Sequence, residues 1–267
     1  MSEYIFRKNA EDRELNRLRL IEAAVDTDTI SSLEETGITR GWSCLELGAG
    51  AGSIVEWLGT RVGPEGSVVA VDKKTAYLRR FSSSPYRVIE GDVLDLPLEG
   101  RVDLMHARYV LIHNKQDREI LKKIQTLVKP GGFVVLEEPD FTSALWLNPH
   151  GDAAHRRVNE AICRVFTNAG LDPASGLGLP RKTAESGFDI VRTRVTMHLC
   201  RGDAPIAKVM AESASVLRKE YTGTGVATDQ DIDGYVANAR DVQHWSVYYS
   251  TVSVIARTTR KRGTWAL

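Results

Sequence analysis

Three glycines, Gly48, Gly50 and Gly52, follow an apolar segment that ends at Leu47. Glycine at these positions permits a tight turn and lets a ligand approach the backbone where a side chain would collide. A second apolar segment ends in Asp72, and an acid at the tip of a strand can accept hydrogen bonds from both hydroxyls of a ribose. This spacing predicts a nucleotide-like ligand held between a glycine loop and an acid.

The spacing of the glycines separates two ligands. A dinucleotide fingerprint needs Gly-x-Gly-x-x-Gly, but position 53 is Ser53 and the third glycine stands at Gly52. The pattern Gly-x-Gly-x-Gly, with the acid Glu46 two residues before it, is typical of S-adenosylmethionine sites, where no pyrophosphate is held. The motif therefore favours S-adenosylmethionine as cofactor and argues against a dehydrogenase.

Strand-like and helical segments alternate through the middle of the chain. Such alternation predicts a doubly wound α/β fold with ligands at the carboxyl ends of parallel strands. Two later strand-like segments complete a seven-stranded sheet, mostly parallel with an antiparallel last strand. The expected strands are 43–47, 67–72, 86–90, 102–106, 132–138, 188–200 and 247–256, with helices at 54–62, 73–82, 115–129 and 152–169.

Helical segments outside this core predict a cap over the substrate. Two helices, 10–25 and 27–36, precede the first strand, and helices at 204–221 and 229–241 fill a connection far longer than a hairpin needs. We expect an N-terminal helical lid at 1–40, a cofactor-binding α/β core at 41–200, a helical cap insertion at 201–246, and the last core strand with a basic tail at 247–267.

Composition limits the class of partner. The 267 residues are 42% hydrophobic, enough for one sizeable core, and 35 Lys and Arg balance 35 Asp and Glu. Because the net charge is zero, we expect a small-molecule acceptor and neither a nucleic-acid nor a membrane partner. A homodimer is compatible with the sequence. Three cysteines without metal-ligand spacing, and no secretory or membrane segment, favour a cytoplasmic protein.

In their order and spacing, residues 28–139 resemble the class I S-adenosylmethionine-dependent methyltransferases, especially small bacterial enzymes that act on natural products and metabolites. The resemblance is carried by the glycine loop, Asp72, Glu90-Gly91-Asp92-Val93, the 102–108 segment and Lys129-Pro130-Gly131-Gly132. It implies methyl transfer from S-adenosylmethionine to a small molecule.

The resemblance implies a role for each cofactor-binding position. Glu46 would lie near the methionine ammonium, the backbone of Gly48, Ala49 and Gly50 would pass against the methionine and ribose, and the carbonyl of Ala107 would hold the ammonium.

At the adenosine end, Asp72 would bind the ribose hydroxyls and Asp92 the exocyclic amine of adenine, with the backbone of Val93 against the ring. Position 73 is Lys73, whereas the family often has an apolar residue there that packs on the adenine. The resemblance therefore does not identify the residue that packs on the adenine ring.

Methyl transfer from a sulfonium is an in-line displacement, so positioning of the acceptor matters most, and a base is needed only where the acceptor loses a proton. His113 and Asp140 follow the fourth and fifth expected strands and are the candidate catalytic residues. A hydroxyl acceptor with His113 as base predicts a rate that rises with pH near neutrality. Capping or surface packing is the structural alternative for His113, and N- or C-methylation is the alternative chemistry.

Several alternatives remain open at this stage. We expect no resident metal, although magnesium could sit between the substrate and Glu137 or Glu138, of which one should face the site. Nucleobase amine methyltransferases carry an Asn/Asp-Pro-Pro-aromatic tetrad after the fourth strand, where this chain has His106-Ala107-Arg108-Tyr109. This difference argues against exocyclic amines of DNA bases as the acceptor. A methyltransferase fold kept as a binding protein is the non-enzymatic alternative, and Trp146, Tyr248 and Tyr249 fit either a pocket wall or the core.

Overall fold

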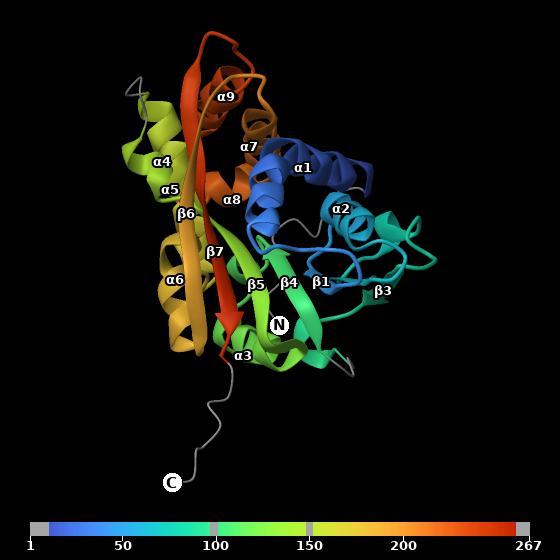
Figure 1. The fold of residues 1–267 in the computed structure, drawn as a ribbon. Coiled ribbons are helices and arrows are strands. Elements are labelled where there is room, and N and C mark those ends of the chain that lie inside the picture. Colours follow the sequence, from blue (N-terminus) through green and yellow to red (C-terminus); the bar gives the residue numbers. More distant parts are fainter. Residues whose placement is uncertain (1–10, 97–100, 148–151, 260–267) are drawn as a thin grey trace.

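One seven-stranded sheet organises the chain (Figure 1). The computed structural model describes residues 11–96, 101–147 and 152–259. The strand order is β3-β2-β1-β4-β5-β7-β6, with β1 to β5 parallel and β7 antiparallel to both of its neighbours, which confirms the expected fold class. The strands are β1 (Ser43–Leu47), β2 (Ser67–Asp72), β3 (Tyr86–Glu90), β4 (Val102–Arg108), β5 (Val128–Asp140), β6 (Phe188–Arg201) and β7 (Trp245–Thr258).

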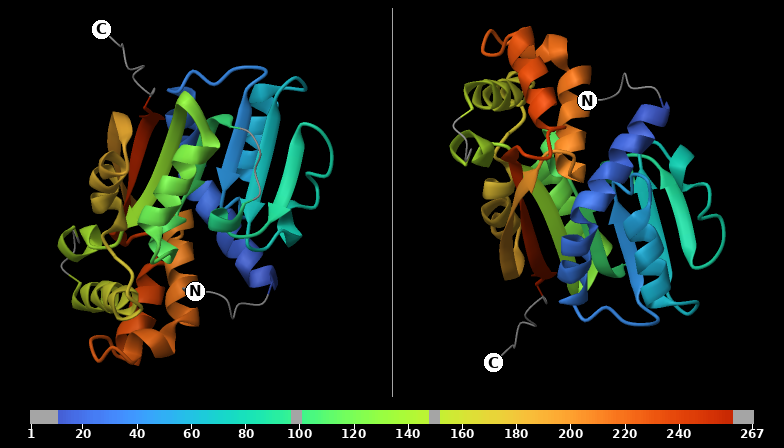
Figure 2. Two further views of the ribbon diagram at one scale, coloured as in Figure 1. Left: turned by 90° about the horizontal axis from the view of Figure 1, so that it is seen from below. Right: turned by 90° about the horizontal axis from the view of Figure 1, so that it is seen from above.

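Helices cover both faces of the sheet (Figure 2). One apolar layer joins α2 and the end of α1 to the sheet, and a second joins α3 and α6 to the opposite face. The helices are α1 (Glu11–Glu34), α2 (Ser53–Val62), α3 (Asp117–Leu127), α4 (Ser143–Trp146), α5 (Ala153–Asn168), α6 (Ser175–Glu185), α7 (Pro205–Val216), α8 (Arg218–Thr222) and α9 (Asp229–Asn238). Short 3₁₀ turns are η1 (Ala76–Leu78), η2 (Val93–Asp95) and η3 (Leu111–His113).

The expected pair of helices at 10–25 and 27–36 is wrong, because α1 is a single helix over Glu11–Glu34. The polar run that begins at Asp26 suggested a helix start. In the structure Asp26 and Thr29 face the sheet and bind Arg108, so they need no capping role. Tertiary contacts thus keep polar residues inside a continuous helix.

The expected helix at 73–82 is also wrong, because only the 3₁₀ turn η1 forms there. Leu78 and Phe81 are buried beneath the glycine loop, where a Cβ on Gly52 would lie 2.6 Å from the Phe81 ring. This packing, rather than a helix, explains the apolar spacing. β5 begins at Val128, before the expected start at 132, and the short α4 and α6 were not predicted from the sequence.

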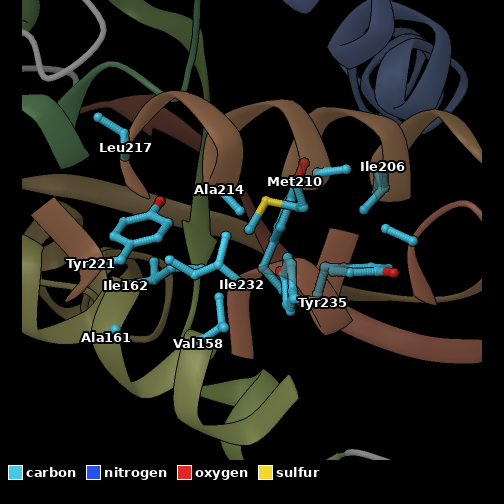
Figure 3. Close-up of a cluster of buried hydrophobic side chains, with 14 of the residues drawn as sticks. Val158, Ala161, Ile162, Ile206, Met210, Ala214, Leu217, Tyr221, Ile232 and Tyr235 are labelled. Carbon is cyan, nitrogen blue, oxygen red and sulfur yellow. The ribbon is translucent and has the colours of Figure 1, made fainter. Parts of the chain in front are cut away.

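The insertion between β6 and β7 carries α7, α8 and α9. These helices pack with α5 around a buried apolar cluster, in which Met210 and Ile232 lie beside Tyr221 and Tyr235 (Figure 3). α1 packs against α7, and Asn16 of α1 donates a hydrogen bond to Glu212 of α7. Lid and cap are therefore one contiguous helical layer.

The three aromatic residues left open by the sequence divide between core and surface. Tyr248 and Tyr249 are buried at 1% and 3% exposure, whereas Trp146 is 79% exposed. Burial places the two tyrosines in the core of the cap, and exposure excludes Trp146 from a buried pocket wall.

Two glycines of α6 give a matched test of how closely this helix packs on β5. A Cβ on Gly176 would lie 2.7 Å from the carbonyl oxygen of Glu138, whereas one on Gly178 would meet only the ends of the Lys182 and Asp172 side chains, no nearer than 3.4 Å. We expect Gly176→Ala to destabilise the protein by about 1–3 kcal/mol through overpacking. Gly178→Ala should stabilise it by roughly 0.5–1 kcal/mol, as alanine does in a helix. Urea denaturation measures both, and equal effects would contradict the tight contact.

Candidate cofactor and acceptor site

The glycine loop between β1 and α2 lies between Val110 and Leu18 of α1. Gly48 and Gly50 have φ angles of +68° and +56°, a region that favours glycine. A Cβ on Gly48 would lie 2.5 Å from Val110 Cγ2, whereas one on Gly50 would meet Leu18 of α1 at 3.6 Å. Gly50 therefore lies beneath Leu18 of α1, with its backbone N–H bound to Asp72.

Asp72 joins this loop to the end of β2. Its carboxylate accepts hydrogen bonds from the backbone N–H of Gly50 at 2.8 Å and of Lys74 at 2.9 Å. Burial raises the pKa of Asp72, and these N–H groups partly offset that effect. The acid that the sequence assigned to the ribose thus lies directly beside the glycine loop.

Asp92 and Lys73 meet at the end of the neighbouring strand. Lys73 Nζ lies 3.1 Å from Asp92 Oδ2, and Asp92 also accepts a hydrogen bond from Leu94 N–H at 3.1 Å. Burial opposes ionisation of Asp92, yet the Leu94 N–H and the Lys73 charge lower its pKa. Val93 is buried at the start of η2. Lys73, which stands where the family often has an apolar residue, is therefore the ion-pair partner of Asp92, the acid that we expect to bind adenine.

Glu46 lies in a buried charge network across the centre of the sheet. It stands opposite His106 in the β1–β4 register, and Glu46 Oε2 lies 2.7 Å from His106 Nδ1. His106 Nε2 lies 3.4 Å from Glu137 Oε2 on β5. Burial opposes protonation of His106, but the two carboxylates outweigh it and raise its pKa to about 9. His106 is therefore a buried cation between two acids.

The same network reaches α1. Arg108, opposite Glu137 in the β4–β5 register, pairs with Asp26 at 2.9 Å and donates to Thr29 Oγ1 at 2.8 Å. Thr29 in turn donates a hydrogen bond to Glu137. Burial would raise the pKa of Glu137, but His106 and Arg108 outweigh it and lower that pKa. We name the set Glu46, His106, Arg108, Glu137, Asp26 and Thr29 the sheet charge network.

Sequence reasoning did not assign roles to His106 and Arg108. They lie on either side of Ala107, whose expected role concerned only its carbonyl, and Ala107 is itself buried between β1 and β5. The available signal was the presence of two basic residues in an apolar segment, because a buried charge needs a partner. Glu46 and Glu137 are those partners.

The candidate acceptor residues lie beyond the ends of β4 and β5. His113 ends η3 and its ring lies 6.3 Å from that of Phe166. Burial and the charge of Arg17 lower the pKa of His113 to about 3. The expected ionisation of His113 near neutrality is therefore wrong, because the ring is neutral throughout that range. Asp140 is buried and accepts two hydrogen bonds from Thr142.

A series of aromatic rings in mutual contact begins at His113 and Phe166. Phe141 lies 5.2 Å from Phe166 and 5.4 Å from Tyr249, and Tyr249 lies 6.1 Å from Tyr109 between ring centroids. We name these four residues with His113 the aromatic wall. Tyr109 and Phe141 directly follow β4 and β5, and the others come from η3, α5 and β7, so the wall joins the core to the cap.

A cavity of about 440 Å³ separates α1 from α7. Arg17 lines this cavity, and the charge of the same residue contributes to the lowered pKa of His113. Arg17 forms a nearly buried ion pair with Glu14 at 2.7 Å. The polar residues that line the cavity are Asp12, Arg13, Asn16, Arg17, Glu212, Ser213, Ser215 and Arg240.

Neither a metal-binding cluster nor a membrane-spanning helix occurs in residues 11–96, 101–147 and 152–259. Nowhere in these ranges do three or more His, Cys, Asp or Glu side chains form a group able to hold a metal ion. The same ranges contain no helix with the length and apolar character needed to span a membrane.

Known proteins share this chain's domain and fold. Residues 45–136 match the model of a methyltransferase domain. Methyltransferase str2 of Strobilurus tenacellus is 24% identical over 232 residues, 78% of this chain and 81% of that protein. An uncharacterized 37.1 kDa protein in transposon TN4556 of Streptomyces fradiae is 27% identical over 66% of this chain, which spans about half, 51%, of that protein's length.

A solved structure, phosphoethanolamine N-methyltransferase 2 of Haemonchus contortus in complex with S-adenosyl-L-methionine, superposes with a TM-score of 0.61. It is 16% identical, and the match covers 97% of this chain and 60% of that one. This likeness establishes the fold.

The protonated His106 predicts a pH-dependent stability. Its pKa rises from 6.5 to about 9 on folding, so its contribution is complete below pH 6.5 and is lost as the pH rises through 9. For a shift of this size, that contribution is about 3 kcal/mol. We expect His106→Gln to lower the free energy of unfolding most at pH 6.5, and the deficit to shrink by pH 9.5. Urea denaturation at both pH values tests this, with His244→Gln as the control; an unchanged deficit would show that His106 is neutral.

Proposed function

We propose that this chain, whose residues 45–136 match a methyltransferase domain, is a class I S-adenosylmethionine-dependent methyltransferase that transfers a methyl group to a hydroxyl oxygen of a small-molecule natural product or metabolite. The observation that carries the proposal is the hydrogen bond that joins Asp72 to the left-handed Gly50 of the glycine loop, at the edge of the sheet that the aromatic wall also borders. Cofactor and acceptor sites would then be adjacent.

The bound cofactor supplies an electrophilic methyl group on a sulfonium. In our proposal Asp72 accepts hydrogen bonds from the ribose, Asp92 and the backbone of Val93 bind adenine, and Glu46 with the Ala107 carbonyl binds the methionine ammonium. Glu46 suits a cation because burial raises its pKa while His106 only partly offsets this, so an additional positive charge would be stabilised.

The aromatic wall and the cavity between α1 and α7 support a small acceptor. Stacked and edge-on rings give an apolar surface for a planar or apolar body, while the polar lining of the cavity admits it from solvent. The balanced charge of the chain, 35 basic and 35 acidic residues, supports the same class of acceptor over a nucleic acid.

His113 is the proposed base, with Asp140 in the adjacent turn. A neutral imidazole can take the hydroxyl proton as the methyl–oxygen bond forms. Its low pKa makes it a weak base, and the nearby Glu14 carboxylate acts in the opposite direction and raises that pKa. The low pKa specifically favours a second candidate, methylation of an amine or activated carbon, in which positioning alone drives the reaction.

Calorimetric titration separates these enzymatic functions from a scaffold role. We expect S-adenosylmethionine to bind and NADH not to bind. Absence of S-adenosylmethionine binding would overturn the enzyme proposal, and NADH binding would instead support a dehydrogenase.

Asp72→Asn tests the cofactor site. The amide loses the charge and one acceptor, so we expect binding of S-adenosylmethionine to weaken by about 1–3 kcal/mol. Titration calorimetry measures the dissociation constant, and Asp103→Asn, at the opposite end of the sheet, is the matched control. An unchanged constant for the Asp72 variant would place the ribose elsewhere.

His113→Ala tests the acceptor chemistry. With transfer from labelled S-adenosylmethionine to a panel of hydroxyl, amine and carbon nucleophiles, we expect hydroxyl turnover to fall roughly a hundredfold or more. Cofactor affinity should be nearly unchanged. A turnover that survives the substitution would remove His113 from proton transfer and favour the amine or carbon acceptor.

A further inference from the structure

Glu138 binds three consecutive backbone amides. Its Oε1 accepts hydrogen bonds from Val110 N–H at 3.0 Å and Leu111 N–H at 2.7 Å, and its Oε2 accepts one from Ile112 N–H at 2.9 Å. Glu138 is 1% exposed, so water does not compete for these donors. A buried carboxylate that receives three N–H groups is a strong and directional anchor.

The anchored amides belong to the turn that separates cofactor and acceptor sides. The turn begins at Tyr109, whose φ of +58° is uncommon for a bulky residue. Val110 packs against Gly48 of the glycine loop, and η3 ends at His113 in the aromatic wall. A strained turn keeps such a conformation only where its surroundings hold it.

We propose that Glu138 is a positioning residue for methyl transfer, whose ionised carboxylate holds the turn 109–113 so that Val110 supports the glycine loop and His113 faces the acceptor. This proposal rests on the proposed function for its kinetic consequence. Its structural consequence, an ordered turn, does not depend on methyl transfer.

Protonation of Glu138 should weaken this anchor. A protonated carboxyl group carries its own O–H and cannot accept equally from all three amides. Burial raises the pKa of Glu138 to about 7, although the three N–H groups and Lys182 oppose that shift. The turn should therefore become more ordered as the pH rises through about 7.

Lys182, the charged group that acts on Glu138, is itself held in ion pairs. Lys182 of α6 pairs with Asp117 of α3 at 2.7 Å and with Asp172 at 3.7 Å. His113, on the anchored turn, has a pKa of about 3, and the β7 residue in register with Glu138 is the uncharged Val252. The residue next to Glu138 in the sequence, Glu137, is a member of the sheet charge network.

Amide hydrogen exchange is the primary test. In the wild-type protein we expect the amides of Val110, Leu111 and Ile112, corrected for intrinsic exchange rates, to gain protection between pH 6 and 8. In Glu138→Gln the side-chain N–H₂ would face an amide donor, so protection should be low and independent of pH. Glu160→Gln, an i,i+4 partner of Arg164 on α5, is the matched control and should behave as wild type.

Turnover gives the second test. We expect the wild-type kcat to rise with pH to a plateau above about 7, and Glu138→Gln to lose this dependence with kcat reduced roughly 10- to 100-fold. The KM for the acceptor should change less than kcat.

The exchange result separates the two proposals. Wild-type amides with the same protection at pH 6 and 8, or full protection in Glu138→Gln, would overturn the role of Glu138 even if methyl transfer is found. Failure of the Gln variant to fold leaves the wild-type pH series as the deciding measurement. Absence of any methyl transfer, with the expected exchange, would overturn only the proposed function.

Discussion

A protonated histidine between two buried carboxylates organises the centre of this protein. Removing charges from water is costly, so Glu46, His106 and Glu137 are compatible with burial only as a set whose members face one another. The β1–β4 register supplies this geometry by placing Glu46 opposite His106. Any slip of one residue would turn one partner to the other face of the sheet, so the charges also fix the register.

The position of α1 follows from the same set of charges. Asp26 and Thr29 complete the partners of Arg108 and Glu137, while Glu22 accepts a hydrogen bond from Ser53 N–H at the start of α2. A helix with low intrinsic amphipathicity is thus held by directional polar contacts. These polar contacts, together with the burial of Val25 and Leu33, determine where α1 lies on the sheet.

The sequence predicted the sheet well, because period and glycine spacing are local properties. The bounds of β1, β2 and β3 were predicted to the residue, and the glycine loop lies where its spacing indicated. The boundary near Asp26 between two expected helices and the expected helix at 73–82 were wrong. Asp26 pairs with Arg108, and Leu78 and Phe81 are buried beneath the glycine loop, so contacts with distant residues determine the local structure. The assigned ligand roles stay predictions.

The candidate site was predictable in position but not in charge state. Strand ends identified Glu46, Asp72, Asp92 and His113 without any knowledge of neighbours. No local pattern predicted that burial and Arg17 would lower the pKa of His113, or that Glu138 would accept hydrogen bonds from three backbone amides. Such properties arise from residues distant along the chain, so pattern alone does not encode them.

The placement of adjacent residues on α1 has a thermodynamic consequence. Leu18 lies over Gly50, while Arg17 lines the cavity and acts on His113. One rigid element therefore forms a boundary of both regions. If a ligand on either side shifts α1, reciprocity requires each ligand to alter the affinity of the other by the same factor. The helix is thus the natural place for cooperativity between donor and acceptor.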